Sequence, residues 1–196
     1  MNDLDIRLPD SLEKIERDTA AIGFGMASDR QTGALLRALA ASKPTSFFLE
    51  LGTGTGLATA WILDGMSACS TLLSVDNDKR FIDIARRHLK RDSRVTFYCE
   101  DGAEYLLGLK GRKFDFIFAD TWPGKYDHLD DALGLLNPGG LYVIDDMLPQ
   151  PNWPEGHADK VAALLEELGA RTDLTVVRMS WSTGLVIATK LSASGI

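Results

Sequence analysis

A glycine-rich segment carries the clearest chemical signal in the chain. Glu50–Gly56 has the sequence Glu-Leu-Gly-Thr-Gly-Thr-Gly, with glycine at every second position from Gly52. Glycine lets the backbone turn sharply and lets a ligand approach main-chain N–H groups without a Cβ in the way. A helix that begins directly after such a loop adds free N–H groups and a partial positive charge. The pattern predicts a ligand-binding loop between a strand and a helix.

The spacing of these glycines narrows the class of ligand. A dinucleotide-binding loop, G-x-G-x-x-G, would need glycine at Leu57 or at Thr59, and no P-loop pattern occurs in the chain. The carboxylate of Glu50 is a poor neighbour for pyrophosphate but suits a ligand that carries an ammonium and a sulfonium. The alternative interpretation is a tight strand-to-helix turn that binds nothing.

Two further acidic residues follow predicted strands. Asp76 comes 20 residues after Gly56, where a carboxylate can accept hydrogen bonds from both hydroxyls of a ribose. Asp78 is better placed to cap the next helix. Asp101 follows the third predicted strand, where it lies beside an adenine, caps a helix, or does both.

These residues depend on a regular alternation of strands and helices. Apolar runs predict strands at 47–51, 71–75, 94–98, 114–119, 141–144, 174–179 and 184–189. Helical patterns begin at Ser11 and at Ser28-Asp29, and recur at 57–66, 81–89, 103–107, 129–136 and 158–168, with a turn at 137–140. Such alternation predicts a mainly parallel sheet covered on both faces. The gap at 180–183 is too short for a crossover, so the last two strands are predicted to pair as an antiparallel hairpin.

Composition and charge exclude several classes of protein. The 196 residues carry a net charge of -7 and are 45% hydrophobic, which predicts one globular domain, 1–196, without a nucleic-acid or anionic-membrane surface. The basic run from Lys79 to Arg94 is predicted to be the solvated face of a helix. Cys69 and Cys99 are predicted to be small buried residues in a reducing compartment. The acidic N-terminus is unlike a signal peptide and no apolar stretch reaches about 20 residues, so we expect a soluble, cytoplasmic protein.

Together the motifs resemble the class I S-adenosylmethionine-dependent methyltransferases, and more narrowly the bacterial and catechol-type O-methyltransferases. The resemblance covers nearly the whole chain, through Met26–Gly33, Glu50–Gly56, Asp76, Asp101, Phe114–Asp120 and Leu136–Asp146. It implies a single Rossmann-like α/β domain with a seven-stranded, mainly parallel sheet, an antiparallel last strand and helices on both faces. The N-terminal helices, 1–45, would extend the domain on the acceptor side.

The resemblance also implies a cofactor and the residues that hold it. S-adenosylmethionine would be the methyl donor, with its methionine end at the glycine loop, its ribose at Asp76 and its adenine at Asp101 and Ala103. Asp120 would lie beneath the sulfonium, close to the acceptor. The predicted cofactor-binding set is Glu50, Gly52, Thr53, Gly54, Gly56, Asp76, Asn77, Asp101, Gly102, Ala103 and Asp120.

A divalent cation is a second implied component. The metal-dependent branch of the family uses two aspartates and an asparagine, which correspond here to Asp120, Asp145 and Asp146. Oxygen ligands suit Mg²⁺ and similar cations. The chain departs from the family at Asp146, which replaces the asparagine, and at Pro123, which replaces a general-base lysine. The alternative is that Asp145-Asp146 orients the loop backbone and the substrate without any ion. Three unpaired carboxylates would be costly if buried, so a metal ion, Lys125 or the sulfonium itself is expected nearby.

The acceptor side is predicted from less specific signals. Lys125, Tyr126, His128 and His157 are candidate bases, each with an alternative structural role, and Asp120, Lys125 and His157 form the predicted catalytic set. The proline-rich Pro149–His157 segment and Trp122 are predicted walls of an acceptor pocket. The predicted reaction is methyl transfer to oxygen, less readily nitrogen, of a small molecule, and the resemblance implies a possible homodimer. The alternatives are a degenerate module without transfer and an NAD-dependent oxidoreductase.

Overall fold

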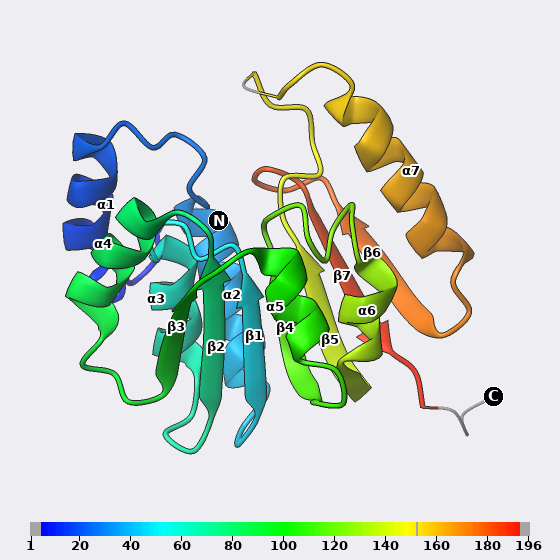
Figure 1. The fold of residues 1–196 in the computed structure, drawn as a ribbon, viewed down its shortest axis with the longest axis horizontal. Helices are drawn as coiled ribbons and strands as arrows, with labels where there is room; N and C mark the ends of the chain where they lie inside the picture. Colours follow the sequence, from blue (N-terminus) through cyan, green and yellow to red (C-terminus); the bar gives the residue numbers. More distant parts are fainter. Residues whose placement is uncertain (1–4, 152, 193–196) are drawn as a thin grey trace.

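The computed structural model describes residues 5–151 and 153–192, and its centre is one seven-stranded sheet (Figure 1). The strands are β1 (Phe47–Leu51), β2 (Thr71–Asp76), β3 (Val95–Cys99), β4 (Phe114–Ala119), β5 (Leu136–Ile144), β6 (Leu174–Met179) and β7 (Leu185–Lys190). Their order in the sheet is β3-β2-β1-β4-β5-β7-β6, and β7 runs antiparallel to both of its neighbours. The predicted mainly parallel sheet and its terminal hairpin are therefore confirmed.

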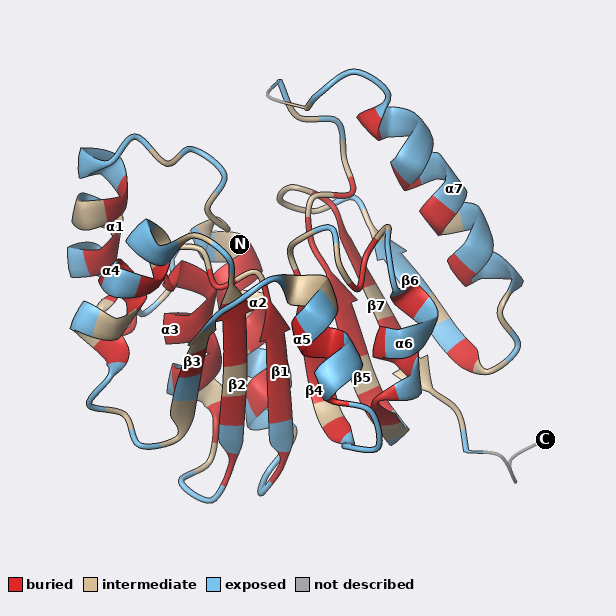
Figure 2. Cartoon of the chain, viewed as in Figure 1, coloured by how far each residue is buried: buried red, intermediate tan, exposed pale blue. Residues whose placement is uncertain are grey.

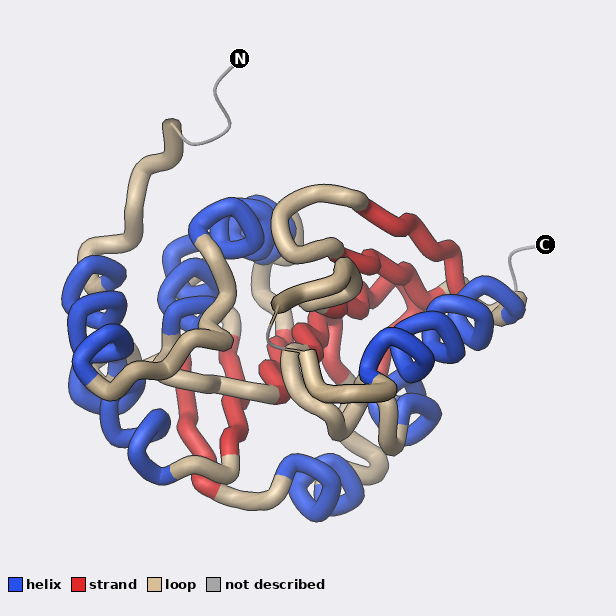
Figure 3. Tube along the Cα trace, turned by 90° about the horizontal axis from the view of Figure 1, so that it is seen from above, coloured by secondary structure: helices blue, strands red, loops and turns tan. Residues whose placement is uncertain are grey.

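Helices cover both faces of this sheet (Figure 3). They are α1 (Leu12–Ala21), α2 (Arg30–Ala41), α3 (Leu57–Gly65), α4 (Lys79–Leu89), α5 (Gly102–Gly108), α6 (Leu129–Gly134) and α7 (His157–Ala170). Buried side chains of α1–α4 form one core with the sheet, and those of α5–α7 form the second. The predicted Rossmann-like α/β architecture, with helices on both faces, is confirmed.

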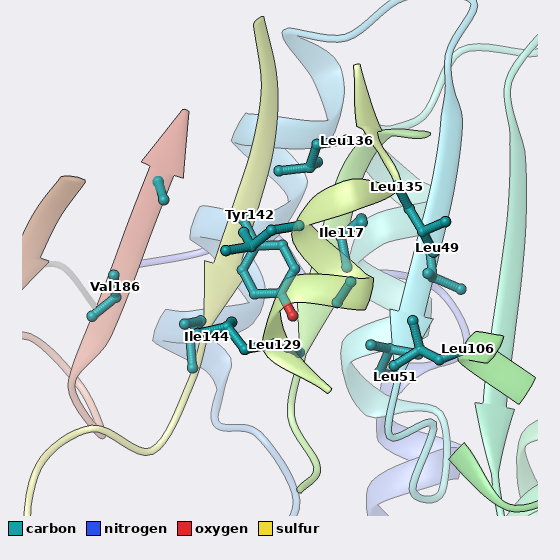
Figure 4. Packing of buried hydrophobic residues seen from close by; sticks show 14 of the residues in the cluster. Leu49, Leu51, Leu106, Ile117, Leu129, Leu135, Leu136, Tyr142, Ile144 and Val186 are labelled. Atoms are coloured by element: carbon teal, nitrogen blue, oxygen red, sulfur yellow. The ribbon is translucent and has the colours of Figure 1, made fainter. Parts of the chain in front are cut away.

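The central strands alternate their side chains between these two cores. Along β1, Phe48 packs with α1–α4, whereas Leu49 and Leu51 pack with α5–α7. Figure 2 shows the inner strands almost wholly buried, and Figure 4 shows Leu49, Leu51 and Tyr142 within the second core. Because both faces are covered, such strands are continuous apolar runs in the sequence, which explains why they were predictable.

An aspartate caps the N-terminus of each of three helices, α2, α4 and α5. The side chain of Asp29 accepts a hydrogen bond from the Thr32 N–H, Asp78 from the Arg80 N–H, and Asp101 from the N–H groups of Ala103 and Glu104. These contacts satisfy main-chain donors that have no partner in the first helical turn. The predicted capping roles of all three aspartates are confirmed.

The beginning of β5 differs from the prediction. We predicted a helix to Leu136, a turn at 137–140 and a strand from Leu141, whereas α6 ends at Gly134 and β5 begins at Leu136. Leu136 pairs with Phe114 and Leu141 with Phe116, so the intervening residues form an irregularity within the strand. Residues 137–140 do interrupt the regular strand pairing, but Leu136 pairs with Phe114 of β4, and β5 therefore begins before them.

The prediction that both cysteines are buried is wrong. Cys69 and Cys99 are free and exposed. Cys69 lies in the turn before β2, and Cys99 is the last residue of β3, an edge strand of the sheet. Neither position has a second layer of structure to cover it.

The basic run from Lys79 to Arg94 occupies α4 and the turn that follows. Lys79 pairs with Asp83, and Arg87 pairs with Asp18 of α1, both at exposed positions, so this helix face is solvated as predicted and partly neutralised. Within residues 5–151 and 153–192, no helix combines the length and apolar character needed to cross a membrane.

Candidate active site

A cavity of about 430 Å³ opens at the carboxyl ends of β1 and β4. The strand order reverses between these two strands, which is where open α/β sheets bind their ligands. The cavity is lined by 24–28 between α1 and α2, by 52–55 after β1, by Asp76 and Asn77 after β2, by parts of 120–126 after β4, by parts of 146–157 after β5, and by Thr183 before β7.

The glycine loop forms one wall of the cavity because its backbone adopts conformations that other residues disfavour. Gly52, Gly54 and Gly56 have φ values of 97°, 51° and 93°, all in the left-handed region. A Cβ on Gly52 would lie 2.6 Å from the carbonyl oxygen of Asp120. Glycine is therefore required at Gly52 twice, for its φ and for the close approach of the loop after β4.

Asp76 supports this loop from the end of β2. Its Oδ2 accepts a hydrogen bond of 2.8 Å from the Gly54 N–H, and its Oδ1 accepts one of 2.9 Å from the Asp78 N–H. The carboxylate also lines the cavity. Asp76 thus lines the cavity while it fixes the conformation of the glycine loop.

The predicted cofactor residues separate into two groups. Those that line the cavity are Gly52, Thr53, Gly54, Asp76, Asn77 and Asp120. Those placed outside the lining formed by the described residues are Glu50, Gly56, Asp101, Gly102 and Ala103. Gly56 precedes α3, where its Cβ would lie 3.0 Å from that of Ala85, and Asp101 caps α5.

Glu50 lies behind the glycine loop and is fully buried. Its Oε2 accepts hydrogen bonds from the hydroxyls of Thr59 and Ser74, and the Ser74 hydroxyl lies 2.6 Å from that of Thr53. Burial raises the pKa of Glu50 to about 7, because an apolar environment disfavours the charged form. Glu50 therefore contacts the cavity wall through Ser74 and Thr53.

Charged groups of opposite sign meet at the other end of the cavity. Asp120, Asp146 and Lys125 line it, and Lys125 is only 4% exposed, with its Nζ donating a 2.6 Å hydrogen bond to the carbonyl oxygen of Asp145. Burial, together with the charges of Asp145 and Asp146, raises the pKa of Asp120 well above its usual range. Burial lowers the pKa of Lys125, and the three carboxylates oppose that shift.

The three aspartates predicted to ligate a metal ion are not assembled as a metal centre. Within the described part of the chain, no group of three or more His, Cys, Asp or Glu side chains is arranged to hold one. The Asp145 Oδ1 accepts hydrogen bonds from the Asp146 N–H and the Thr183 hydroxyl, while Asp146 has a left-handed φ of 56° and lines the cavity. Asp145 is thus hydrogen-bonded within the protein while Asp146 lines the cavity, and the described residues do not form the predicted metal centre.

Aromatic side chains form the wall beside this charged end. Trp122, Tyr126, Trp153 and His157 all line the cavity. The Tyr126 hydroxyl lies 3.0 Å from His157 Nε2, and the rings of Trp153 and His157 are 4.5 Å apart. Burial lowers the pKa of His157, which favours the neutral imidazole. Trp122 and four described residues of the Pro149–His157 segment (Gln150, Trp153, Pro154 and His157) thus line the cavity, and their role as walls of an acceptor pocket stays a prediction.

The candidate bases do not all reach the cavity. Lys125, Tyr126 and His157 line it, whereas His128 lies outside the lining that the described residues form and has its Nδ1 2.9 Å from Asp131 on α6. His128 is therefore a residue of a helix terminus rather than a residue of the site.

Sequence reasoning missed two polar contacts and an aromatic pair. The Ser28 hydroxyl donates a 3.0 Å hydrogen bond to Asp120, which lies 92 positions away in the chain, and the Thr183 hydroxyl donates to Asp145. The rings of Phe24 and Phe81 lie 4.2 Å apart beside the glycine loop. The sequence predicts only the start of a helix at Ser28-Asp29 and only a hairpin turn at 180–183. No local pattern points to either contact.

Similarity to known proteins agrees with this geometry. A Mycobacterium ulcerans protein named "Putative O-methyltransferase" is 30% identical over 141 residues, which cover 69% of this chain and 62% of that protein. The chain thus covers less than two thirds of the length of that relative.

Solved structures share the whole fold. One is the O-methyltransferase TomG from Streptomyces achromogenes, involved in tomaymycin synthesis and solved in complex with SAM, with a TM-score of 0.82 and 21% identity over 96% of this chain and 93% of that one. Another is the O-methyltransferase from Bacillus cereus in complex with SAH, with a TM-score of 0.81 and 22% identity over 96% of this chain and 94% of that one.

A family model adds the last comparison. Residues 49–147, which hold the glycine loop, Asp76, Asp120 and the Asp145-Asp146 pair, match the family described as methyltransferase domain. This match spans half of the chain, so the protein belongs to the methyltransferase domain family.

Proposed function

We propose that this protein transfers a methyl group from S-adenosylmethionine to an oxygen of a small-molecule acceptor. The observation that carries the proposal is one continuous cavity with two chemically different ends. The glycine loop and Asp76 line one end, aromatic rings and charged groups line the other, and Asp120 lies where β4 delivers it at the switch point. Relatives bearing O-methyltransferase names and structures solved with SAM or SAH support it.

The donor end suits an amino-acid and nucleoside ligand. A ligand can approach the backbone of the glycine loop closely because Gly52 and Gly54 carry no Cβ, while their N–H groups donate to the Val75 carbonyl and to Asp76. The Asp76 carboxylate offers acceptors for ribose hydroxyls. Phe24 and Phe81 supply an apolar surface next to these polar groups. When bound, the cofactor supplies an electrophilic methyl group carried on a sulfonium. Asp101 and Ala103, outside the lining, are proposed only as neighbours of the adenine edge.

The acceptor end suits a flat molecule with a hydroxyl group. Trp122 and Trp153 offer aromatic surface. Asp120 would lie near the sulfonium, whose positive charge would favour the ionised carboxylate against the raised pKa of the ligand-free site. In our proposal His157, kept neutral by burial, receives the acceptor proton by way of the Tyr126 hydroxyl 3.0 Å away. Orientation of the reacting atoms supplies much of the remaining rate enhancement. No divalent cation enters this proposal, because Asp120, Asp145 and Asp146 are not grouped as a metal centre in the described part of the chain.

Ligand titration tests the donor half of the proposal. Calorimetry with S-adenosylmethionine, S-adenosylhomocysteine and NAD should show binding of the first two. Methyl transfer is then followed by mass spectrometry with a panel of phenols, carboxylates and amines. Preferential binding of NAD would contradict the cofactor assignment. Cofactor binding without transfer to any member of the panel would indicate a module that has lost its chemistry.

The variant Asp76→Ala tests the placement of the cofactor. In our proposal the Asp76 carboxylate accepts hydrogen bonds from the ribose hydroxyls. Because a hydrogen bond to a charged group contributes about 1.5–3 kcal/mol, its loss should weaken S-adenosylhomocysteine binding by roughly 10- to 100-fold. Asp78→Ala is the matched control, because Asp78 caps α4 and interacts with Arg80. Equal affinities of Asp76→Ala and the wild type would mean that the ribose lies elsewhere.

A further inference from the structure

Lys125 is held in the cavity wall by a loop with little freedom to move. Its own N–H donates to the Trp122 carbonyl at 3.0 Å, and the preceding Gly124 has a φ of 85°. A Cβ on Gly124 would lie 2.5 Å from Leu51, and the buried Tyr142 hydroxyl donates to the Gly124 carbonyl. The loop is thus packed against the core of the sheet, and this packing defines where the lysine side chain begins.

The Lys125 ammonium is the positive group among three buried or partly buried carboxylates. Its Nζ donates to the Asp145 main chain, and it interacts electrostatically with Asp120, Asp145 and Asp146. An isolated buried ammonium, or three buried carboxylates without a cation, would each be costly. The attraction between the ammonium and the carboxylates offsets part of the cost of burying each of them. This attraction explains why both kinds of charged group can be buried at this site.

One oxygen of Asp145 and one oxygen of Asp120 already accept hydrogen bonds from the protein. The Asp145 Oδ1 is bound to the Asp146 N–H and the Thr183 hydroxyl, and the Asp120 Oδ2 is bound to Ser28. Mg²⁺ requires near-ideal octahedral coordination by oxygen. It would also have to approach a fixed ammonium of the same sign in a buried site, where repulsion is strong.

We propose that the Lys125 ammonium is the resident cation of the acceptor end, in place of a divalent metal ion, and that it positions the acceptor oxygen for methyl transfer without metal. The role of Lys125 in positioning the acceptor oxygen rests on the proposed function, whereas its role as the resident cation rests on the geometry of the site alone. An ammonium has three N–H donors, and in the described part of the chain one of them bonds to the Asp145 carbonyl. A second donor can bind the acceptor oxygen and stabilise negative charge on it.

The wild-type protein provides the first test. Mg²⁺ and Mn²⁺ are titrated calorimetrically into the complex with S-adenosylhomocysteine, and methyl transfer is measured with and without EDTA. We expect no saturable binding of either ion and no loss of rate with EDTA. Stoichiometric binding that Asp146→Ala abolishes, or a rate lost in EDTA and restored by Mg²⁺, would overturn the proposal. If no acceptor is methylated, the proposed function fails, yet the titration still decides the question of the cation.

Removal of the ammonium is the second test. Lys125→Ala should lower kcat by roughly 100-fold, the loss typical of one preorganised donor, with S-adenosylhomocysteine affinity little changed. Lys113→Ala is the matched control, because the Lys113 Nζ also donates to a main-chain carbonyl, that of Gly134, at 2.6 Å but at an exposed position. This control should keep the wild-type rate.

Chemical rescue separates the charge of Lys125 from its volume. Added ethylammonium should restore part of the rate of Lys125→Ala, whereas ethanol of similar size should not. Rescue by both compounds, rescue by neither, or full activity of the unrescued variant would contradict a role for the ammonium. If the variant does not fold, the metal titration of the wild type remains decisive.

Discussion

The carboxyl groups around the cavity have three different kinds of partner. Asp76 accepts hydrogen bonds from main-chain N–H groups. Glu50 accepts from two hydroxyls in a fully buried position, where its pKa is raised to about 7. Asp145 accepts from Thr183 and from the main chain, and burial raises its pKa to about 6. The protonation of the last two groups therefore depends on pH between mildly acidic and neutral conditions.

Glu50 should make the stability of the protein depend on pH. The folded state keeps the Glu50 proton up to about pH 7, whereas the unfolded chain releases it near the ordinary pKa of 4.5. The contribution of neutral Glu50 to the free energy of unfolding is therefore fully present below about pH 4.5. It is lost as pH rises through 7, and the free energy of unfolding falls by about 3 kcal/mol in total. Urea unfolding of the ligand-free protein at pH 5 and pH 8 should show that Glu50→Gln loses less stability over this interval than the wild type.

The control for this prediction is Glu166→Gln, which changes an exposed glutamate of α7. It should follow the pH dependence of the wild type, since its carboxyl is solvated in both states. A Glu50→Gln protein with the same pH dependence as the wild type would show that Glu50 is ionised in the folded state.

At the scale of elements, the glycine loop and the loop after β4 depend on each other. The Asp120 N–H donates to the Leu51 carbonyl at 2.9 Å, and the Asp120 carbonyl occupies the space that a Cβ on Gly52 would need. Asp120 reaches the cavity because two parallel strands end side by side and their loops pack without intervening side chains. The position where the strand order reverses therefore depends on the close packing of the loops after β1 and β4 as well as on the topology of the sheet.

Gly52→Ala measures this packing. Gly111 is the matched control, because its φ of 89° resembles that of Gly52 at 97°, but a Cβ there would meet nothing within 4 Å. Gly111→Ala should cost about 1–2 kcal/mol for its left-handed conformation. Gly52→Ala should cost a further 1–3 kcal/mol or so from overpacking and should weaken S-adenosylhomocysteine binding. Equal unfolding free energies of the two variants in urea would contradict the close approach.

At the scale of the whole molecule, the cavity joins segments from both ends of the chain. The connection 24–28, the loops after β1 and β4, and the segment 150–157 all contribute to its lining. Figure 3, which views the molecule from above, shows loops over the sheet with helices on either side of them. A ligand in the cavity would therefore add contacts between these segments, two of which are already joined by the Ser28–Asp120 hydrogen bond.

Cofactor binding should consequently stabilise the fold and protect distant segments together. At about 100 times its Kd, S-adenosylhomocysteine should raise the free energy of unfolding by about 2.7 kcal/mol. Hydrogen exchange should slow in 24–28 and in 52–56, and exchange in β6, remote from the cavity lining, should not change. Protection confined to one of the first two segments would mean that the ligand does not span them, and NAD serves as the negative control.

Local patterns in the sequence determined most of the fold and six of the eleven predicted cofactor residues, which line the cavity. Buried strands are continuous apolar runs, and three of the helices begin at aspartates, so the order of elements follows from neighbouring residues. The glycine loop and Asp76 were predictable for the same reason, since each lies directly after a strand and requires only that the strand be parallel. Asp101 was predicted both as a cap and beside the adenine, and the structure confirms the cap.

The tertiary structure alone decided how the acceptor end is arranged. The direction of the Asp145 carboxylate depends on Thr183, 38 positions away in the chain, and the burial of Lys125 depends on the packing of Gly124 against Leu51. Glu50 was expected at the ligand, but Ser74 and Thr59 hold it behind the loop. A sequence shows which residues a strand end delivers, whereas the direction of each side chain depends on partners that only the folded chain brings near. For that reason the sequence predicted a metal site at three aspartates, whereas the folded chain places the Lys125 ammonium among their carboxylates.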